Sequence, residues 1–177
     1  MAITYHDLYL KTRMALSSAG IEAAQLEARE ILCAAAEKTA EELYRDISLY
    51  TTDAIAEKTE ALQARRLAGE PIAYLLGEWS FCGLPFFVSP AALIPRVDTE
   101  MLAQLAMNRL KEHPGHTRIL DLCAGTGCVG LTAAALLKNT RAVLVDLSDG
   151  ALDLCKRNIR RHKLTGRAVS LKGDALQ

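Results

Sequence analysis

A glycine-rich turn flanked by aspartates is the part of this sequence best suited to chemistry. Residues 121–130 read Asp-Leu-Cys-Ala-Gly-Thr-Gly-Cys-Val-Gly between an apolar run and a helical pattern, and Asp146 ends the next apolar run. Glycines let backbone N–H groups approach a ligand at the start of a helix, and a carboxylate about 20 residues later can bind two ribose hydroxyls. The spacing therefore predicts a site for a nucleoside cofactor.

The same glycines fit more than one cofactor. Gly125, Gly127 and Gly130 satisfy the Gly-x-Gly-x-x-Gly fingerprint of NAD-binding domains, which is weak support when it stands alone. A dinucleotide would bring its pyrophosphate to this loop, where the carboxylate of Asp121 would repel it. S-Adenosylmethionine carries a sulfonium and an ammonium group with one carboxylate, so an acidic neighbour suits it. We therefore favour S-adenosylmethionine, with an NAD-dependent oxidoreductase as the alternative enzyme.

A third aspartate strengthens this interpretation. Asp174, followed by Ala175, comes after a third apolar run, where its carboxylate could accept a hydrogen bond from an adenine amino group. Asp121, Asp146 and Asp174 would then lie at the carboxyl ends of three strands, the edge at which open parallel sheets bind ligands. Each aspartate alone is more typical of a helix cap or a solvated loop. The three in this order indicate a methyltransferase.

The elements that must position these residues follow from the hydrophobic pattern. After residue 115 the sequence predicts strands at 118–122, 142–147 and 168–171, and helices at 128–138 and 150–162. Such alternation predicts right-handed βαβ units and a parallel sheet. Upstream, residues 77–90 carry the only tryptophan and all three phenylalanines around a Cys-Gly-Leu-Pro turn, which predicts a β-hairpin. A helix to about Lys111 follows, and we expect Asp98 or Thr99 to cap it.

The first 70 residues have a different character, with Ala, Glu and Leu at helical spacing. They predict a bundle of short helices at 5–19, 21–37, 40–46 and 54–68. Thr4 and Thr39 each precede an acidic residue by three positions, which predicts two capping boxes. The bundle is either a structural cap or a docking surface for a macromolecular substrate, and the sequence leaves both interpretations open.

Composition limits the class of protein. Lys and Arg number 21 and so do Asp and Glu, so no excess of positive charge points to nucleic acid. No apolar stretch approaches a bilayer span and the N-terminus lacks a signal-peptide pattern, which predicts a cytoplasmic protein without membrane contact. The five cysteines include no Cys-x-x-Cys pair. We expect free thiols and no metal site.

Further motifs resemble those of a known family, the protein-(glutamine-N5) methyltransferases of peptide chain release factors, called PrmC or HemK. The resemblance rests on Pro95-Arg-Val-Asp-Thr-Glu100, close to that family's Pro-Arg-Pro-x-Thr-Glu signature, on Gly77-Glu-Trp-Ser-Phe81 and on Glu70-Pro71-Ile72. It implies an α/β protein with a helical substrate-docking domain at 1–72, a hairpin linker at 73–94 and, at 95–177, the first half of a Rossmann-like methyltransferase sheet. The implied reaction is methylation of the glutamine in the Gly-Gly-Gln motif of release factors.

The resemblance also assigns roles to residues. It places the cofactor loop at Cys123, Ala124, Gly125, Thr126 and Gly127, the ribose at Asp146, and the adenine at Asp174 and Ala175. Arg96 and Thr99 are placed near the methionine end. Asp121 joins this set as the acid beside the loop.

Two departures from the family matter. The family usually has glycine where Cys123 stands, so a loop with positive φ would be less free there. The family's Asn-Pro-Pro-Tyr motif, which follows its fourth strand, is absent from the sequence. We therefore assign no catalytic residue and expect an N-terminal fragment that binds cofactor weakly and transfers no methyl group alone.

Resemblance implies that catalysis consists of positioning an amide nitrogen, a poor nucleophile, against the sulfonium methyl group. No histidine is needed as a general base, and we expect all four to be solvated. Two further alternatives stay open. One is a non-catalytic module that binds release factors. The other is a nucleic-acid methyltransferase, against which the neutral charge weighs.

Overall fold

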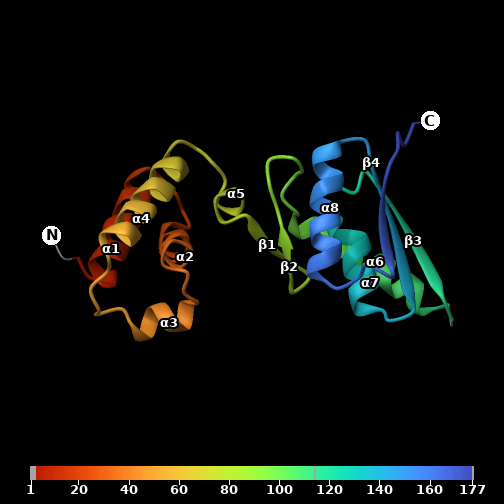
Figure 1. Cartoon of the computed structure of the whole chain (residues 1–177), viewed down its shortest axis with the longest axis horizontal. Coiled ribbons are helices and arrows are strands. Elements are labelled where there is room, and N and C mark those ends of the chain that lie inside the picture. The colour runs from red at the N-terminus through yellow and green to blue at the C-terminus, as the bar shows by residue number, and fades with distance from the viewer. Residues whose placement is uncertain (1–2, 114, 177) are drawn as a thin grey trace. The chain divides into compact units, whose positions relative to one another are not determined.

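The structure, a computed structural model, describes residues 3–113 and 115–176 (Figure 1). The chain divides into two compact units, Met1–Leu76 and Gly77–Gln177, so the hairpin groups with the C-terminal unit. Among the described residues, no helix combines the length and the apolarity that crossing a bilayer requires.

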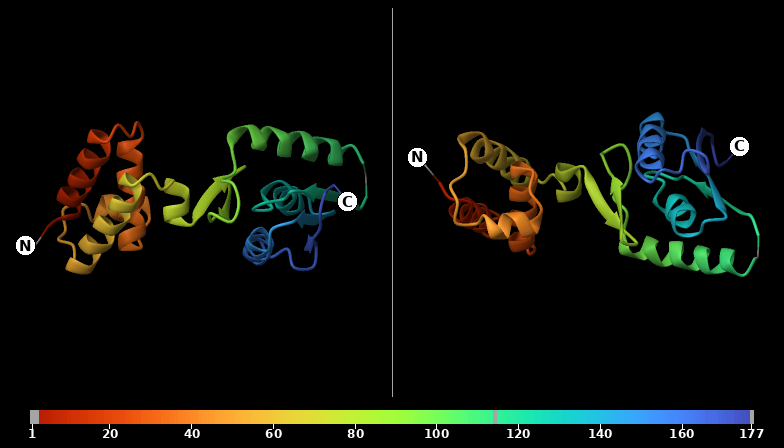
Figure 2. Two further views of the ribbon diagram at one scale, coloured as in Figure 1. Left: turned by 90° about the horizontal axis from the view of Figure 1, so that it is seen from above. Right: turned by 60° about the horizontal axis from the view of Figure 1, so that its bottom comes forward.

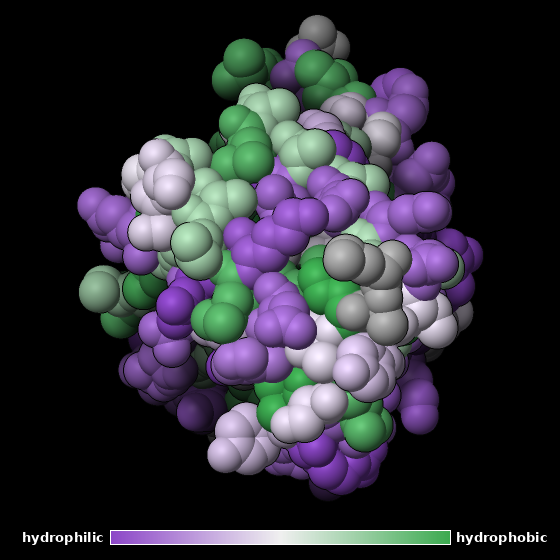
Figure 3. Space-filling model, turned by 90° about the vertical axis from the view of Figure 1, so that its left-hand side faces the viewer, coloured by the Kyte–Doolittle hydropathy of each residue, from purple (hydrophilic) through white to green (hydrophobic). Residues whose placement is uncertain are grey.

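The N-terminal unit is helical, as predicted. Its helices are α1 (Tyr5–Ser18), α2 (Ala24–Ala36), α3 (Ala40–Arg45), α4 (Asp53–Leu67) and the short α5 (Ile72–Leu76). Helix α5 was not anticipated from the sequence. Its core includes the leucine and isoleucine residues that are at most 1% exposed, namely Leu8, Leu16, Ile31 and Leu32. On the face seen in Figure 3, hydrophilic side chains are interspersed with small hydrophobic groups.

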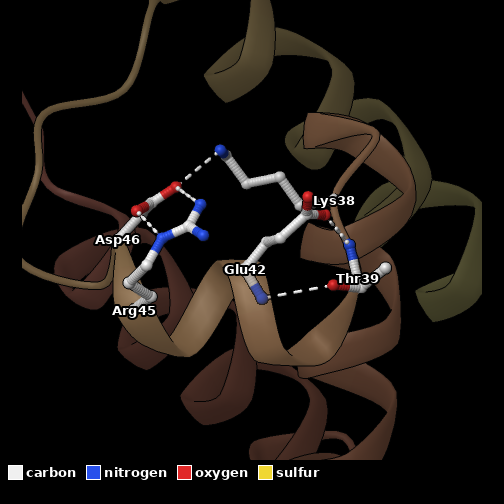
Figure 4. Close-up of polar contacts among 5 residues, drawn as sticks. All are labelled: Lys38, Thr39, Glu42, Arg45 and Asp46. Atoms are coloured by element: carbon white, nitrogen blue, oxygen red, sulfur yellow. Dashed lines mark hydrogen bonds and ion pairs between the residues drawn. The ribbon is translucent and has the colours of Figure 1, made fainter.

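Both predicted capping boxes are confirmed. At α3, the Thr39 hydroxyl accepts a hydrogen bond from the Glu42 amide at 3.2 Å, and the Glu42 carboxylate accepts one from the Thr39 amide at 2.8 Å (Figure 4). At the other end of α3, Asp46 accepts from Arg45 at 2.9 Å and from Lys38 at 2.8 Å. These two cations lower the pKa of Asp46 to about 2. Both ends of this short helix therefore have polar partners.

The C-terminal unit begins with the predicted hairpin, which consists of β1 (Glu78–Phe81) and β2 (Leu84–Phe87). Its two-residue turn has φ of 50° at Cys82 and 75° at Gly83, as in a type I′ turn. Phe81 and Phe86 are at most 1% exposed and pack edge to face with centroids 6.1 Å apart. Phe81 and Phe86 thus form the packing face of the hairpin, whereas Trp79 is exposed.

Helix α6 (Val97–Lys111) differs from expectation at its start. The prediction that Asp98 or Thr99 caps it was wrong: the N-cap residue is Arg96, and its side chain makes no capping bond. Arg96 follows Pro95 in an extended conformation, so helical geometry begins one residue later, and both predicted caps lie inside the first turn. Glu100, on that turn, accepts a hydrogen bond from the Cys82 amide at 2.7 Å. This bond ties the hairpin turn to α6.

The predicted parallel sheet is confirmed. Its strands are β3 (Thr117–Leu122), β4 (Thr140–Asp146) and β5 (Ala168–Lys172), in the order β3-β4-β5. Helices α7 (Cys128–Leu136) and α8 (Asp149–Arg161) connect them and lie on the same face (Figures 1 and 2). Leu144 on β4 is fully buried beneath these helices. The chain therefore has the predicted α/β architecture, with β3 at an edge of the described sheet.

One histidine contradicts the expectation that all four are solvated. His6, His113 and His116 are exposed, but His162 is half-buried with its ring centroid 4.6 Å from that of Phe86. Burial and the nearby Arg161 lower the pKa of His162. This histidine is a packing partner of the hairpin, which the helical pattern alone did not indicate.

Candidate cofactor site

A pocket of about 380 Å³ lies where the segment before α6 meets the glycine-rich loop. Its volume falls within the range of about 300–1,000 Å³ that is usual for small-molecule sites. Seven predicted site residues line it together: Arg96, Thr99, Cys123, Ala124, Gly125, Thr126 and Asp146. The structure thus brings the Pro-Arg-Val-Asp-Thr-Glu segment and the glycine-rich loop to one cavity.

The loop between β3 and α7 has an unusual backbone. Residues Cys123, Gly125 and Gly127 all have positive φ, at 56°, 56° and 76°. Gly127 is the N-cap of α7, and its amide donates to the Ala124 carbonyl at 2.7 Å. Cys123 is exposed at the pocket. The loop thus adopts a positive φ at Cys123 although this residue is not glycine, and that conformation costs a residue with a Cβ roughly 1–2 kcal/mol.

Replacing Cys123 with glycine should stabilise the C-terminal unit by about 0.5–1 kcal/mol. Relief of the left-handed strain favours the glycine, and the greater freedom of glycine in the unfolded chain offsets part of the gain. Urea unfolding measures the difference. Cys123→Ala is the matched control, because it removes the thiol and keeps the strained Cβ. Equal stabilities of the two variants would show that strain is not the cause.

Asp146 fastens the loop to the start of α8. One carboxylate oxygen accepts from the Gly125 amide at 2.8 Å, and the other accepts from the Ser148 amide at 3.0 Å. Ser148 caps α8 through its hydroxyl, which accepts from the Ala151 amide at 3.4 Å. Each carboxylate oxygen keeps a second lone pair, so both remain able to accept from a hydroxyl group of a ligand.

Asp121 lies beneath the loop and is not among the pocket-lining residues. Its carboxylate accepts from the Gly130 amide at 2.9 Å, in the first turn of α7. Burial raises the pKa of Asp121, the Gly130 bond opposes that rise, and the charge of Asp146 adds to it. The positive end of α7 therefore already holds a carboxylate. That arrangement leaves α7 less suited to a phosphate than an uncapped helix would be.

The remaining predicted residues lie outside the pocket lining. Gly127 is a buried residue at the end of the loop, while Asp174 and Ala175 are exposed after β5. The Asp174 carboxylate accepts from the Leu176 amide at 2.9 Å, which forms a local turn. Contact of Asp121, Gly127, Asp174 and Ala175 with a cofactor therefore stays a prediction.

Sequence reasoning missed the packing that holds the pocket wall. A Cβ added to Gly150 would lie 3.0 Å from the Cβ of Ala91, and one added to Gly125 would lie 3.6 Å from that of Ala92. Small residues on both sides thus let the segment 91–96 approach the loop and α8 closely. The paired alanines offered only a weak signal, because alanine is common in every part of this chain.

Asn158 was also missed, although it connects three parts of the C-terminal unit. Its side-chain amide donates to the carbonyls of Phe87, at 3.0 Å, and Thr126, at 2.9 Å, and its oxygen accepts from the Phe87 amide at 2.8 Å. The residue is fully buried on α8. Asn158 therefore joins the hairpin to the glycine-rich loop. Its place in the apolar stripe of a charged helix was the signal that could have found it.

Two family models match the chain. Residues 7–77 match the PrmC N-terminal domain, and residues 96–177 match the methyltransferase small domain. The first covers the helical unit, and the second covers the segment from Arg96 through the glycine-rich loop to the end of the sheet.

Curated relatives carry one name. A "Release factor glutamine methyltransferase" of Nitratidesulfovibrio vulgaris is 35% identical over 97% of this chain and 57% of its own length. That of Aliivibrio fischeri is 36% identical over 90% of this chain and 56% of its own length. That of Escherichia coli is 47% identical over 60% of this chain and 38% of its own length. This chain spans little more than half the length of the Nitratidesulfovibrio vulgaris and Aliivibrio fischeri proteins.

The two matched domains follow each other in the order expected from the resemblance, and they account for both units of the structure. The motif at Pro95–Glu100 lies at the junction between the hairpin and the methyltransferase small domain. The chain therefore consists of a region that matches the PrmC N-terminal domain, followed by a region that matches the methyltransferase small domain.

Proposed function

We propose that this chain binds S-adenosylmethionine and contributes to methylation, at N5, of the glutamine in the Gly-Gly-Gln motif of peptide chain release factors. The observation that carries the proposal is the pocket in which Arg96 and Thr99 meet the glycine-rich loop and Asp146. The names of the relatives support the choice of acceptor.

The pocket residues fit such a cofactor. Asp146 has acceptor capacity for ribose hydroxyls, and Arg96 places a cation at the start of α6, where a carboxylate would be favoured. Asp121 lies on β3 and is separated from the loop by one residue, Leu122. The negative charge of its carboxylate favours a cationic ligand over a phosphate. When bound, S-adenosylmethionine supplies a methyl group activated by its sulfonium. The residues of this chain bind and orient that donor.

Asp146→Asn should weaken binding of S-adenosylhomocysteine by about 10- to 100-fold. The NH₂ group of asparagine would face the N–H of Ser148 or of Gly125, so one of these two hydrogen bonds would be lost. The single remaining oxygen could accept from only one ribose hydroxyl. A hydrogen bond to a charged group is worth about 1.5–3 kcal/mol, which corresponds to the expected loss of affinity. Isothermal titration calorimetry of the whole chain measures the affinity. Asp153→Asn is the matched control, because Asp153 is exposed on α8 and pairs with Lys156 on the same helix at 2.9 Å.

The titration also separates the alternatives. Binding of NADH in preference to S-adenosylhomocysteine would favour an oxidoreductase. Affinity for a release factor without affinity for either nucleoside would favour a non-catalytic binding module. Unchanged affinity of the Asp146→Asn variant for S-adenosylhomocysteine would show that the cofactor does not bind in this pocket.

We place the docking of the release factor on the N-terminal unit. A groove of about 640 Å³ there is lined largely by apolar side chains from α1, α2 and α3, among them Tyr9, Leu26, Leu43 and Tyr44. Tyr44 is 82% exposed and Leu26 is 51% exposed, so both are available to a protein partner. Aromatic and aliphatic groups of this kind commonly anchor protein interfaces. Tyr44→Glu with unchanged affinity for a release factor would exclude this groove.

A further inference from the structure

Helix α8 packs between the hairpin and the sheet, where it contacts β2, β4 and β5 (Figure 1). Cys155 and Asn158 lie three positions apart on this helix, so their side chains project from the same face. Both residues are fully buried. A thiol and a side-chain amide are both hydrogen-bond donors. One buried face of α8 therefore carries two donors that need acceptors.

The acceptors are two consecutive carbonyls of the glycine-rich loop. The Cys155 thiol donates to the Gly125 carbonyl, with the sulfur and the oxygen 3.3 Å apart. The Asn158 amide donates to the Thr126 carbonyl at 2.9 Å. Burial raises the pKa of Cys155 to about 12, so the thiol keeps its proton at neutral pH and remains a donor. Both carbonyls are thus directed toward α8.

Gly125 is held on both of its peptide units. Its amide donates to the Asp146 carboxylate at 2.8 Å, and its carbonyl accepts from Cys155. Glycine at a φ of 56° has no side chain to restrain it, so its backbone would otherwise be free to adopt other conformations. The bond from Asp146 fixes one flanking peptide plane, and the bond from Cys155 fixes the other.

The bond from Cys155 also sets the direction of a backbone donor. A peptide unit is planar and trans, so an N–H points away from the carbonyl of the preceding residue. With the Gly125 carbonyl turned to Cys155, the Thr126 N–H points away from that thiol. Thr126 lines the pocket, and within residues 3–113 and 115–176 its N–H has no hydrogen-bond partner. A buried N–H without an internal partner is rare, and this one is available to a ligand.

Asn158 extends the same support to the hairpin. Its oxygen accepts from the Phe87 amide at 2.8 Å, and its NH₂ group donates to the Phe87 carbonyl at 3.0 Å. Phe87 ends β2, shortly before the segment 91–96 that lines the pocket. One face of α8 therefore holds the loop directly and this segment through the hairpin.

We infer that Cys155 and Asn158 are positioning residues for the cofactor, which keep the Gly125 and Thr126 carbonyls on α8 and the loop in the conformation that binds S-adenosylmethionine. This role rests on the proposed function. A packing role would need only apolar volume at the two positions, whereas a positioning role needs the hydrogen bonds. A loop released from α8 would populate other conformations, and affinity falls in proportion to the population that can bind.

Cys155 allows the cleaner test, because Asn158 also anchors the hairpin. Cys155→Ala removes the donor and should weaken binding of S-adenosylhomocysteine to the whole chain by about three- to tenfold, as expected for one hydrogen bond. Cys155→Ser keeps a donor on the same carbon and should stay within about twofold of the parent. Isothermal titration calorimetry measures both affinities. Cys33→Ala and Cys33→Ser are the matched controls, because Cys33 is buried in the N-terminal unit, and both should bind as the parent does.

Hydrogen exchange of the Gly125 amide, followed by NMR, reports on the loop without any ligand. This amide is bound to Asp146, so its exchange requires local opening of the loop. Exchange should be about three- to tenfold faster in Cys155→Ala than in the parent, and Cys155→Ser should restore the slower rate. Circular dichroism verifies that each variant is folded at the temperature of the titration.

Two results would overturn the positioning role. If Cys155→Ala matched the parent in affinity and in exchange, the thiol would only fill space. If the alanine and serine variants lost affinity equally, the volume of the sulfur would be the cause. Absence of binding to the parent chain would instead defeat the proposed function, and the exchange rates would still decide whether α8 holds the loop.

Discussion

Asn158→Asp is expected to destabilise the C-terminal unit by about 3–5 kcal/mol, because a buried carboxylate would then lack compensation. The two side chains have the same shape, so packing is preserved. The two bonds that the Asn158 amide donates, to the Phe87 and Thr126 carbonyls, would be replaced by oxygens facing oxygens. The residue is 0% exposed, so water cannot relieve that contact.

Urea unfolding monitored by tryptophan fluorescence measures this change, since Trp79, the only tryptophan, lies on β1 of the same unit. Asn108→Asp provides the matched control. Asn108 is exposed on α6, and its side-chain oxygen accepts a hydrogen bond from Gln104 that an aspartate can also accept, so its replacement should change stability by less than about 0.5 kcal/mol. A loss below about 1 kcal/mol at position 158 would contradict the assigned hydrogen-bond network.

Gly127→Ala has the second large expected effect, a loss of about 2–5 kcal/mol. Its φ of 76° imposes a backbone strain of about 1–2 kcal/mol on any residue with a Cβ. The added Cβ would also lie 2.8 Å from a methyl carbon of Leu144 and 3.2 Å from the Cys155 sulfur. Both neighbours are fully buried, so their displacement would disturb the surrounding core, and we expect overpacking to add about 1–3 kcal/mol.

Gly83→Ala separates the two contributions. Gly83 has a φ of 75°, nearly that of Gly127, but a Cβ there would meet nothing within 4 Å. The same denaturation experiment should therefore show only the backbone strain at Gly83. Equal losses for the two variants would mean that Leu144 and Cys155 accommodate the methyl group, and the crowding beneath the loop would be disproved.

The parts of the fold that depend on local pattern were predictable. Alternating strands and helices predicted the parallel sheet, and the aromatic residues around Cys82-Gly83-Leu84-Pro85 predicted the hairpin, because period and turn chemistry are properties of neighbouring residues. The turn itself is shorter than predicted, since Leu84 and Pro85 belong to β2. Helix α5 was missed because five residues after Pro71 are too short for a periodic signal. The cap of α6 was misplaced because the choice between Arg96, Asp98 and Thr99 depends on where the chain enters the helix.

In the candidate site, too, the parts that depend on local pattern were predictable and the parts that depend on tertiary packing were not. The glycine-rich loop and Asp146 could be identified because their spacing reflects one βαβ unit. The apolar stripe of α8 indicated that Asn158 is buried, but it could not indicate the partners of Asn158. Its bonds to Phe87 span 71 positions and depend on the packing of α8 against the hairpin. The alanines at 91 and 92 form the pocket wall only where Gly125 and Gly150 leave space for them. Contacts of this kind arise from tertiary structure, which no local pattern records.

The crowding around Leu144 has a consequence for how this family can vary. A Cβ added at Gly127 would lie 2.8 Å from a methyl carbon of Leu144, and one added at Gly130 would lie 2.6 Å from the other methyl carbon. The side chain of Leu144 therefore fills the space that side chains at both glycine positions would need. The three positions should therefore change together during evolution. In homologous sequences, a larger residue at either glycine position should appear together with a smaller residue at the position of Leu144.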